Sequence, residues 1–283
     1  MTNFFNKPIK LKEPSAIAGF KITITFTIVY LLLIVVIPLS GLFVVASHNS
    51  LDNFIKTVSD ERMIHAYKIS FGCSFLAAII NVVFGTILCW VLVRYNFFAK
   101  RILDAIVDLP FALPTAVAGI ALATIYAPDG WIGKYFKNYD QSGIKIAFTP
   151  IGIVIALVFV GLPFVVRTVQ PVLQDLEKEV EEAASILGAN RFQIFVRIII
   201  PYLTPALLTG FSMAFARALG EYGSVIFIAG NMPFVSEIVP LMVVIKLEQY
   251  DYAGATAIAI VMLTVSFILL LMINYLQKFN HKK

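Results

Sequence analysis

The sequence of 283 residues is poor in charge, because Asp, Glu, Lys and Arg together make up only 14% of it. Soluble domains carry about 25% charged residues, and a chain with far fewer cannot cover itself with a solvated surface. Hydrophobic residues account for 59% instead. The scarcity of charge therefore excludes an ordinary soluble domain and indicates a membrane protein.

Residues that perform catalysis or hold cofactors are also scarce. The three histidines, His48, His65 and His281, have no partner at the spacing of metal ligands, which excludes an HExxH protease. No GxSxG nucleophile motif is present, and "GWIGKY" at 130–135 lacks the GxxxxGK[ST] spacing of a phosphate loop. We therefore expect no catalytic residue, no metal site and no cofactor bound by this chain, and a transport component rather than an enzyme.

Only two cysteines occur, Cys73 and Cys89, and both lie in one apolar run. A helix separates residues 16 positions apart by about 24 Å, whereas a disulfide needs Cα atoms within about 7 Å. We therefore expect two small buried side chains that do not pair with each other within this helix.

Six apolar runs approach the roughly 20 residues that a helix needs to cross a bilayer. They cover residues 22–46, 70–93, 105–126, 147–166, 201–228 and 252–276. The first run is longer than the core of a signal peptide and has no small-x-small cleavage site, so we expect it to be a retained span. The runs predict an all-α membrane protein with six transmembrane helices.

Basic residues are distributed unevenly between the two sides of these spans. The two ends of the chain and the loops after the second and fourth spans hold 14 of the 22 Lys and Arg residues, and the opposite side holds 7. Because cytoplasmic loops carry the excess of basic residues, both termini are predicted to be cytoplasmic. The predicted organisation is a cytoplasmic segment at 1–21, a six-helix domain at 22–276 and a cytoplasmic tail at 277–283. The net charge of +5 needs no nucleic acid to explain it.

The loop at 173–200, between the fourth and fifth spans, is too acidic to cross a membrane. Its apolar residues Leu173, Leu176, Val180, Ala183, Ala184 and Leu187 recur at spacings of three and four. This spacing predicts an amphipathic helix over 173–187. Gly188 suits the position that ends a helix with a positive φ, and a second apolar helix then leads into the fifth span. The alanine pair would let another protein approach the backbone closely, and the alternative is a solvated loop helix.

Glu182-Ala183-Ala184, Gly188 after three more residues, and an apolar stretch ending at Pro201 together resemble the EAA loop of ABC importer permeases. Further stretches resemble the sulfate/thiosulfate importer permeases, and their T-type subunit more than the W-type. They are "DLPFALPTAVAG" (108–119), "GLPFVVRTVQPVL" (161–173) and "ARALGEYGSVIFIAGN" (216–231). The resemblance runs from about residue 15 to the carboxyl end, with mild departures such as Tyr222, where the family usually has Phe.

This resemblance implies a type I ABC importer permease fold and an alternating-access mechanism in a bacterial inner membrane. It implies that the loop is a cytoplasmic coupling helix, which docks into a groove on an ATPase. The residues implied in that contact are Glu181, Glu182, Ala183, Ala184, Leu187, Gly188 and Ala189. The implied partners are a W-type permease subunit, two ATPase subunits that bind ATP and Mg, an extracytoplasmic sulfate-binding protein and the surrounding lipid.

Two other functions remain open at this point. "ALGEYG" occurs in similar form in molybdate permeases, so a molybdate or tungstate importer would share it. An ATP-independent ion-coupled carrier would have acidic sites near the middle of the membrane and no EAA loop, whereas this chain has Glu221 together with the complete loop.

Two charges fall inside the fifth predicted span. Arg217 and Glu221 are four residues apart and therefore share one helical face. Because a charge at the centre of a span costs about 2.5–3.5 kcal/mol, we expect both to face the protein interior or a water-filled path. One hypothesis is that Arg217 lines the path and offsets the charge of sulfate while Glu221 holds the guanidinium. The alternative is a structural clamp between helices.

Small residues and prolines mark places where the spans bend. Gly220 and Gly223 allow either close helix packing or a local break, which would present backbone N–H groups to an oxyanion. Prolines at 110, 114 and 163 predict ordinary kinks in the third and fourth spans. Asn81, the one amide side chain in the second span, predicts a hydrogen bond between helices.

Overall fold

A computed structural model describes residues 20–47, 50–136 and 145–280, and the side chains of 276–280 are not described. Most of the predicted amino-terminal segment 1–21 and the last three residues of the predicted tail 277–283 lie outside these ranges. The chain divides into two compact units, Met1–His48 and Asn49–Lys283. Every regular element in the described ranges is helical, so the all-α prediction is confirmed.

The first unit contains one apolar helix. It consists of α1 (Phe20–Leu31), a π-helical turn η1 (Leu32–Val36) and α2 (Ile37–Ser47). Pro38 follows the π turn by two residues and has no N–H for the carbonyl four residues before it. The wider turn accommodates that missing bond, since π turns occur where the helical ladder is interrupted.

The second unit holds the remaining helices. In chain order they are α3 (Leu51–Val58), α4 (Glu61–Arg94), α5 (Lys100–Ala112), α6 (Thr115–Tyr126), the 3₁₀ turn η2 (Gly133–Tyr135), α7 (Pro150–Asp175), α8 (Lys178–Ile186), α9 (Arg191–Ile194), the π turn η3 (Phe195–Ile199), α10 (Ile200–Leu219), α11 (Val225–Ile228), α12 (Val239–Glu248) and α13 (Tyr252–Asn280). The π turn η3 also ends two residues before a proline, Pro201.

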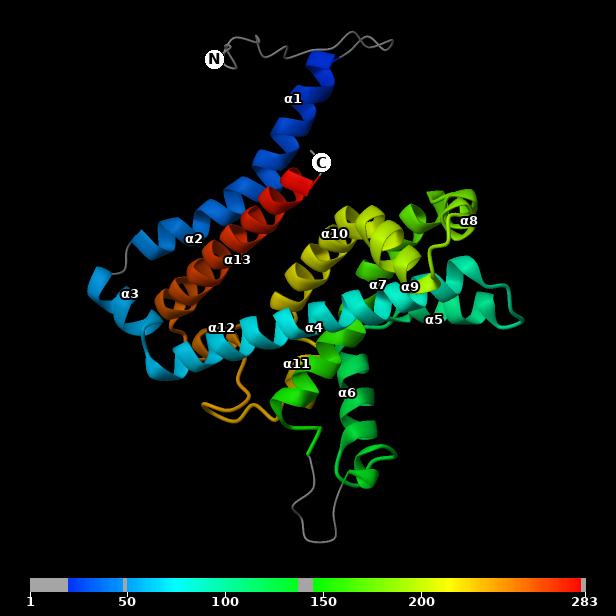
Figure 1. Cartoon of the computed structure of the whole chain (residues 1–283). Helices are drawn as coiled ribbons and strands as arrows, with labels where there is room; N and C mark the ends of the chain where they lie inside the picture. The colour runs from blue at the N-terminus through cyan, green and yellow to red at the C-terminus, as the bar shows by residue number, and fades with distance from the viewer. Residues whose placement is uncertain (1–19, 48–49, 137–144, 281–283) are drawn as a thin grey trace. The chain divides into compact units, whose positions relative to one another are not determined.

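Helices α4, α7 and α10 pack against one another and form the centre of this unit (Figure 1). They approach closely because small residues lie where they cross, with Gly85 of α4 and Gly210 of α10 both against Val165 of α7. Between spans, where lipid is as apolar as the side chains, such close van der Waals packing is what favours association. The buried core here is rich in valine and alanine, including Val165, Val166, Val169, Ala78, Ala206 and Ala214.

The cysteines belong to this core, as expected. Cys73 and Cys89 are both buried and unpaired, and the Cys89 thiol donates to the carbonyl of Val166 at 3.4 Å. Asn81 differs from its prediction. It is buried against Gly161 of α7, but in the described part of the chain neither its Nδ2 nor its Oδ1 has a hydrogen-bond partner. The glycine that faces the amide has no side chain with which to bond it.

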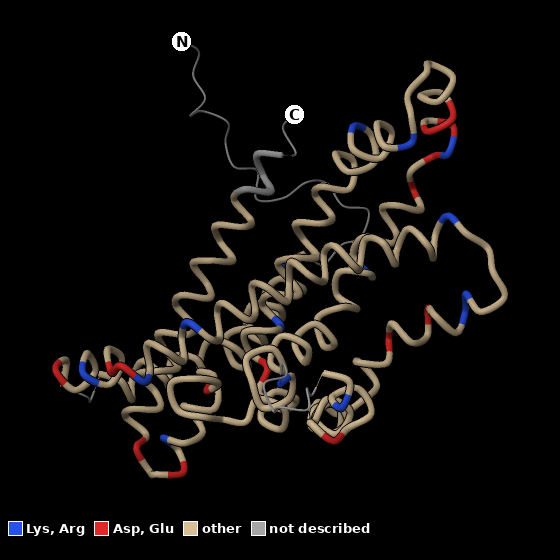
Figure 2. The backbone as a smooth tube through the Cα atoms, turned by 60° about the horizontal axis from the view of Figure 1, so that its bottom comes forward, with Lys and Arg blue, Asp and Glu red and all other residues tan. Residues whose placement is uncertain are grey.

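Charged residues lie mostly at helix ends and in loops (Figure 2). At the start of α4, the Arg62 Nε donates to Glu237 at 2.7 Å. At the start of α13, the Asp251 carboxylate accepts from the N–H of Gly254 at 2.8 Å and pairs with Lys246 at 2.9 Å. The pKa of Asp251 lies below its ordinary value. The main cause is the hydrogen bond from the Lys246 ammonium, and the second is the hydrogen bond from the Gly254 N–H.

Five described helices are long and apolar enough to cross a membrane, and the pair α5–α6 makes a sixth span if it counts as one. The five are Phe20–Ser47, Glu61–Arg94, Pro150–Asp175, Arg191–Leu219 and Tyr252–Tyr275. The prediction of six spans is thus confirmed in number when the bent pair is included, and the chain is a multi-pass membrane protein.

Two predicted spans differ in form from the continuous helices that the apolar runs suggested. The third bends by 113° between α5 and α6, which is a break rather than the kink we predicted. Leu113 is extended at that point, with ψ 135°, because the residue before a proline avoids the helical region. The fifth ends at Leu219 rather than continuing to residue 228. By contrast, α7 continues through Gly161, Pro163 and Pro171.

Candidate functional site

The predicted coupling segment begins where α7 ends. Asp175 is the last residue of α7, Leu176 adopts an extended conformation, and Glu177 caps the start of α8. Leu176 is buried, with 5% of its surface exposed. Glu179 and Glu181 lie in the first turn of α8, where negative charge is favourable because the helix dipole is positive at that end.

Gly188 terminates α8 in the way its position in the sequence predicts. Its φ is +86°, its N–H donates to Ser185 O at 3.0 Å, and the Ala189 N–H donates to Ala184 O at 3.1 Å. These two bonds form a Schellman motif, which needs a left-handed residue at this position. Asn190 then caps α9 through reciprocal bonds with Gln193 of 2.8 and 2.9 Å.

The amphipathic helix predicted over 173–187 is shorter than expected. Leu173 belongs to α7, and α8 covers only nine residues, because Leu176 packs into the core and turns the chain. The predicted coupling residues are therefore presented differently. Ala184 and Ala189 pack against the core and Glu181 is partly buried, whereas Glu182, Ala183, Leu187 and Gly188 are exposed.

An exposed apolar surface lies at the end of α8 and the start of α9. Ile186, Leu187 and Phe192 are 86%, 88% and 74% exposed, and together we call them the apolar tip. Sequence reasoning identified Leu187 as part of this segment but not Ile186, although two adjacent apolar residues before a terminating glycine would have been a signal. Contiguous exposed apolar residues on a loop mark interaction sites.

The Arg217–Glu221 pair lies where α10 ends. Arg217 is in the last turn, Gly220 is the C-cap and Glu221 lies just outside the helix. The two side chains still meet, with Nη1 of Arg217 2.6 Å from Oε2 of Glu221. Glu221 is 3% exposed, and its Oε1 accepts from both the N–H and the hydroxyl of Ser224, at 2.8 and 2.9 Å. We predicted that Arg217 and Glu221 share one face of a continuous helix. They do pair, but Arg217 lies inside α10 and Glu221 lies beyond its end.

Gly220 and Gly223 predicted either close helix packing or a local break, and the helix is broken here, because α10 ends at Leu219. A Cβ at Gly220 would meet nothing within 4 Å, whereas a Cβ at Gly223 would lie 2.2 Å from the Thr115 hydroxyl of α6. Gly119 of α6 approaches the same segment, since its Cβ would lie 2.3 Å from Ser224 O. The broken third span and the broken fifth span therefore pack directly against each other, close to Arg217 in sequence.

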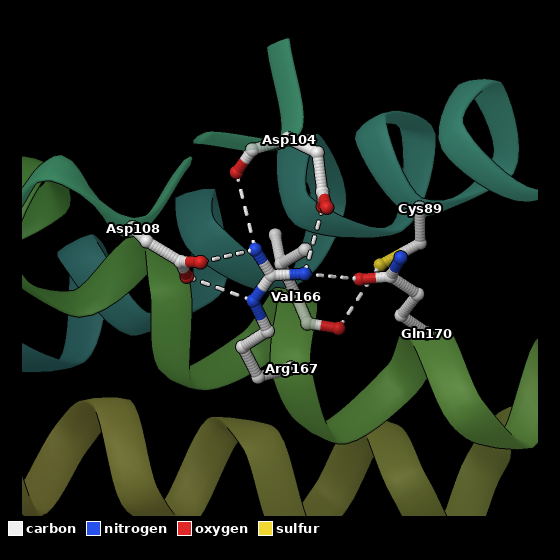
Figure 3. A network of polar contacts seen from close by, with 6 residues as sticks. All are labelled: Cys89, Asp104, Asp108, Val166, Arg167 and Gln170. Carbon is white, nitrogen blue, oxygen red and sulfur yellow. Dashed lines mark hydrogen bonds and ion pairs between the residues drawn. The ribbon is translucent and has the colours of Figure 1, made fainter. Parts of the chain in front are cut away.

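A second charged cluster joins α5 to α7 (Figure 3). Arg167 was expected in the cytoplasmic loop, but it lies within α7. Its Nε and Nη2 donate to the Asp108 carboxylate at 2.8 and 2.6 Å, and its Nη1 donates to Asp104 and to Gln170 at 2.8 and 2.7 Å. Nη2 also donates to the Asp104 carbonyl at 3.1 Å, so all the guanidinium donors are used. The sequence analysis missed this cluster, because Asp104 and Arg167 lie 63 positions apart and nothing in their local sequence indicates that they pair.

The chain is similar to several proteins named as sulfate transport system permeases. The chain is 50% identical over 256 residues to the sulfate transport system permease protein CysT of Synechocystis sp., covering 90% of this chain and 88% of the relative. It is 48% identical over 256 residues to a probable sulfate transport system permease protein of Nephroselmis olivacea, covering 90% and 89%. It is 43% identical over 259 residues to CysT of Escherichia coli K12, covering 92% of each.

A solved structure has the same fold. The crystal structure of a bacterial ABC transporter involved in the import of alginate aligns with a TM-score of 0.75 at 17% identity, covering 92% of this chain and 94% of that one. Identity at this level supports the fold alone, which is that of ABC importer permeases. The sequence between residues 81 and 282 matches the family model of binding-protein-dependent transport system inner membrane components. With relatives this similar along nearly its whole length and α8 positioned between α7 and α10, the chain belongs to the family of binding-protein-dependent transport system inner membrane components.

Proposed function

We propose that this chain is the membrane-spanning subunit of an ATP-driven importer for sulfate or thiosulfate. The observation that carries the proposal is the 43–50% identity, over about nine-tenths of the chain, to proteins named as sulfate transport system permeases. The chain forms the translocation path, and alternating access moves the anion across the membrane.

In this proposal α8 and the apolar tip receive the ATPase. Glu181, Glu182, Ala183, Ala184, Leu187, Gly188 and Ala189 form or support the contact. The exposure of Ile186, Leu187 and Phe192 supports it, because a loop that presents three large apolar side chains to solvent gains most from a partner that covers them. ATP and Mg bind to the partner ATPase, consistent with the lack of a phosphate loop motif in this sequence, and this chain performs no catalysis.

Arg217, Gly220, Glu221 and Gly223 are proposed to contribute to the substrate path. In the described part of the chain, the ion pair with Glu221 is the one interaction of the Arg217 guanidinium. Its other donors can therefore reach a passing oxyanion, which guanidinium groups bind well. Glu221 is held by Ser224 and orients Arg217. Arg167 is unsuited to this role because its donors are occupied by Asp104, Asp108 and Gln170.

The complete importer would hold this chain, a W-type permease, two ATPase subunits and an extracytoplasmic sulfate-binding protein. The chain would lie in a bacterial inner membrane with segments 1–21 and 277–283 in the cytoplasm. The contact of Arg94, after the second span, with Glu181 of α8 supports this topology, since it requires the second and fourth loops to lie on one side.

Uptake of labelled sulfate in cells with and without this chain tests the proposal. We expect uptake only with the chain, lowered by excess unlabelled sulfate or thiosulfate much more than by excess molybdate. An ATPase should also co-purify with the tagged chain. Inhibition by molybdate as strong as by sulfate would indicate a molybdate or tungstate importer instead. Uptake that persists without any co-purifying ATPase would favour an ion-coupled carrier.

A further inference from the structure

The last turn of α4 contacts the coupling segment at two places. At the first, the Arg94 Nη2 donates to the Leu176 carbonyl at 3.2 Å and also to the Glu181 carboxylate. Leu176 is the joint between α7 and α8, and Glu181 is in the first turn of α8. One terminal nitrogen of Arg94 therefore connects the second span to both sides of the joint.

The second place involves Trp90, one turn earlier in α4. Its ring packs edge-on against Phe195 at 6.0 Å between centroids, and Phe195 begins the π turn that leads into α10. The Arg94 guanidinium lies over the same indole, 5.7 Å from its centroid. Trp90 thus supports Arg94 on one side and holds the far end of the coupling segment on the other.

Within the described residues, the hydrogen bonds of Arg94 all go to the coupling segment. Its side chain is only 10% exposed, and both of its hydrogen-bonding partners, Leu176 and Glu181, belong to that segment. The Nε is buried without a partner in the described part of the chain. A mostly buried guanidinium whose hydrogen bonds all go to one joint is placed to set the angle between α7 and α8.

We propose that Arg94 is a positioning residue that transmits movement of α8 to α4. This inference rests on the proposed function, in which an ATPase moves α8. Because Arg94 bonds both Leu176 and Glu181, α8 cannot tilt about Leu176 without either moving α4 or breaking the Arg94 bonds. Since α4 packs along α7 and α10, a movement of α4 reaches the central spans. Arg94 therefore converts a movement of a nine-residue helix into a movement of the central spans.

The test uses the complete transporter, purified through a tag on this chain and reconstituted in liposomes, with sulfate uptake and ATP hydrolysis measured together. We expect Arg94→Gln to leave the amount of co-purified ATPase and its rate of hydrolysis within about twofold of the unchanged protein. Uptake per ATP should fall about tenfold, because a hydrogen bond to a charged group shifts an equilibrium by about that factor. Arg94→Lys keeps the charge near Glu181 but not both bonds, so it should recover uptake in part.

Arg101→Gln is the matched control, since Arg101 is exposed at the same end of the bundle and the described residues include no hydrogen-bond or ion-pair partner for it. It should leave uptake per ATP unchanged. Glu181→Ala is a second variant that leaves the packing of the spans intact, and it should also lower uptake per ATP. If Arg94→Gln fails to assemble, normal coupling in Glu181→Ala overturns the inference, as does normal coupling in an assembled Arg94→Gln. Absence of an ATPase or of sulfate uptake in the unchanged protein would instead contradict the proposed function.

Discussion

Arg167 and Arg217 both lie within spans, and their surroundings give them different uses. Arg167 donates hydrogen bonds to two carboxylates, an amide and a backbone carbonyl, and these bonds connect α5 to α7. Arg217 makes one ion pair and is one-third exposed. A guanidinium with all its donors occupied is a structural tie, whereas one with donors to spare can take part in moving an anion.

Removing the charge of Arg217 should therefore impair transport. We expect Arg217→Gln to lower sulfate uptake at least about tenfold, because a charge-assisted hydrogen bond to the anion is lost. Glu221→Gln should have a smaller effect, since its amide oxygen can still accept from Ser224. Uptake in liposomes at equal amounts of assembled transporter measures both. Arg197→Gln, an exposed arginine of the same span, is the control, and normal uptake in both Arg217→Gln and Glu221→Gln would exclude the path role.

Individual residues were predictable from the sequence where the cause is local. The positive φ of Gly188 follows from its place after an apolar-periodic stretch, and the structure confirms it. The pairing of Arg94 with Glu181 and of Arg167 with Asp108 was not predictable, because these partners lie 87 and 59 positions away along the chain. The predicted hydrogen bond of Asn81 between helices was wrong for the same reason, since the residue that faces Asn81 on α7 is a glycine.

At the scale of elements, the broken third span is the feature that most changes the site. Pro110 is tolerated inside α5, whereas the break falls at Leu113 and Pro114. The sequence shows several prolines and does not say which one breaks the helix. The choice depends on packing, because α6 turns away to lie against α11 and the segment that follows α10.

The contact between the two broken spans predicts an unequal response to glycine substitution. Gly119→Ala should destabilise the protein by about 1–3 kcal/mol, because the added methyl group would lie 2.3 Å from the backbone oxygen of Ser224. Gly72→Ala, in α4 with nothing within 4 Å, should be neutral or stabilising by up to about 1 kcal/mol. Thermal unfolding of the purified chain in detergent measures the difference. Equal melting temperatures would contradict this contact.

At the scale of the whole molecule, the proposed topology places the loop before α5 and the turn after α6 on opposite sides of the membrane. Phe98 and Trp131 are exposed aromatic residues of these two segments, at 104% and 83%. The native cysteines, Cys73 and Cys89, are buried and should not react.

Cysteine labelling in membrane vesicles tests that topology. A membrane-impermeant maleimide should label Phe98→Cys only from the cytoplasmic side and Trp131→Cys only from the opposite side, because a bilayer-spanning segment separates the two positions. The unchanged chain, with its two buried thiols, is the control for background. Labelling of both variants from one side would show that α5–α6 enters and leaves the membrane on the same face.

Local sequence was enough to predict an all-α protein of the membrane, the positions of most of its spans and the glycine at which α8 ends. These properties depend on hydropathy, periodicity and glycine conformation within about 20 neighbouring residues. The break between α5 and α6, the end of α10 at Leu219 and the contact of Arg94 with Glu181 come from the three-dimensional packing instead. Those outcomes depend on which distant segments pack together, and the energy of such contacts is not contained in any local stretch of the chain.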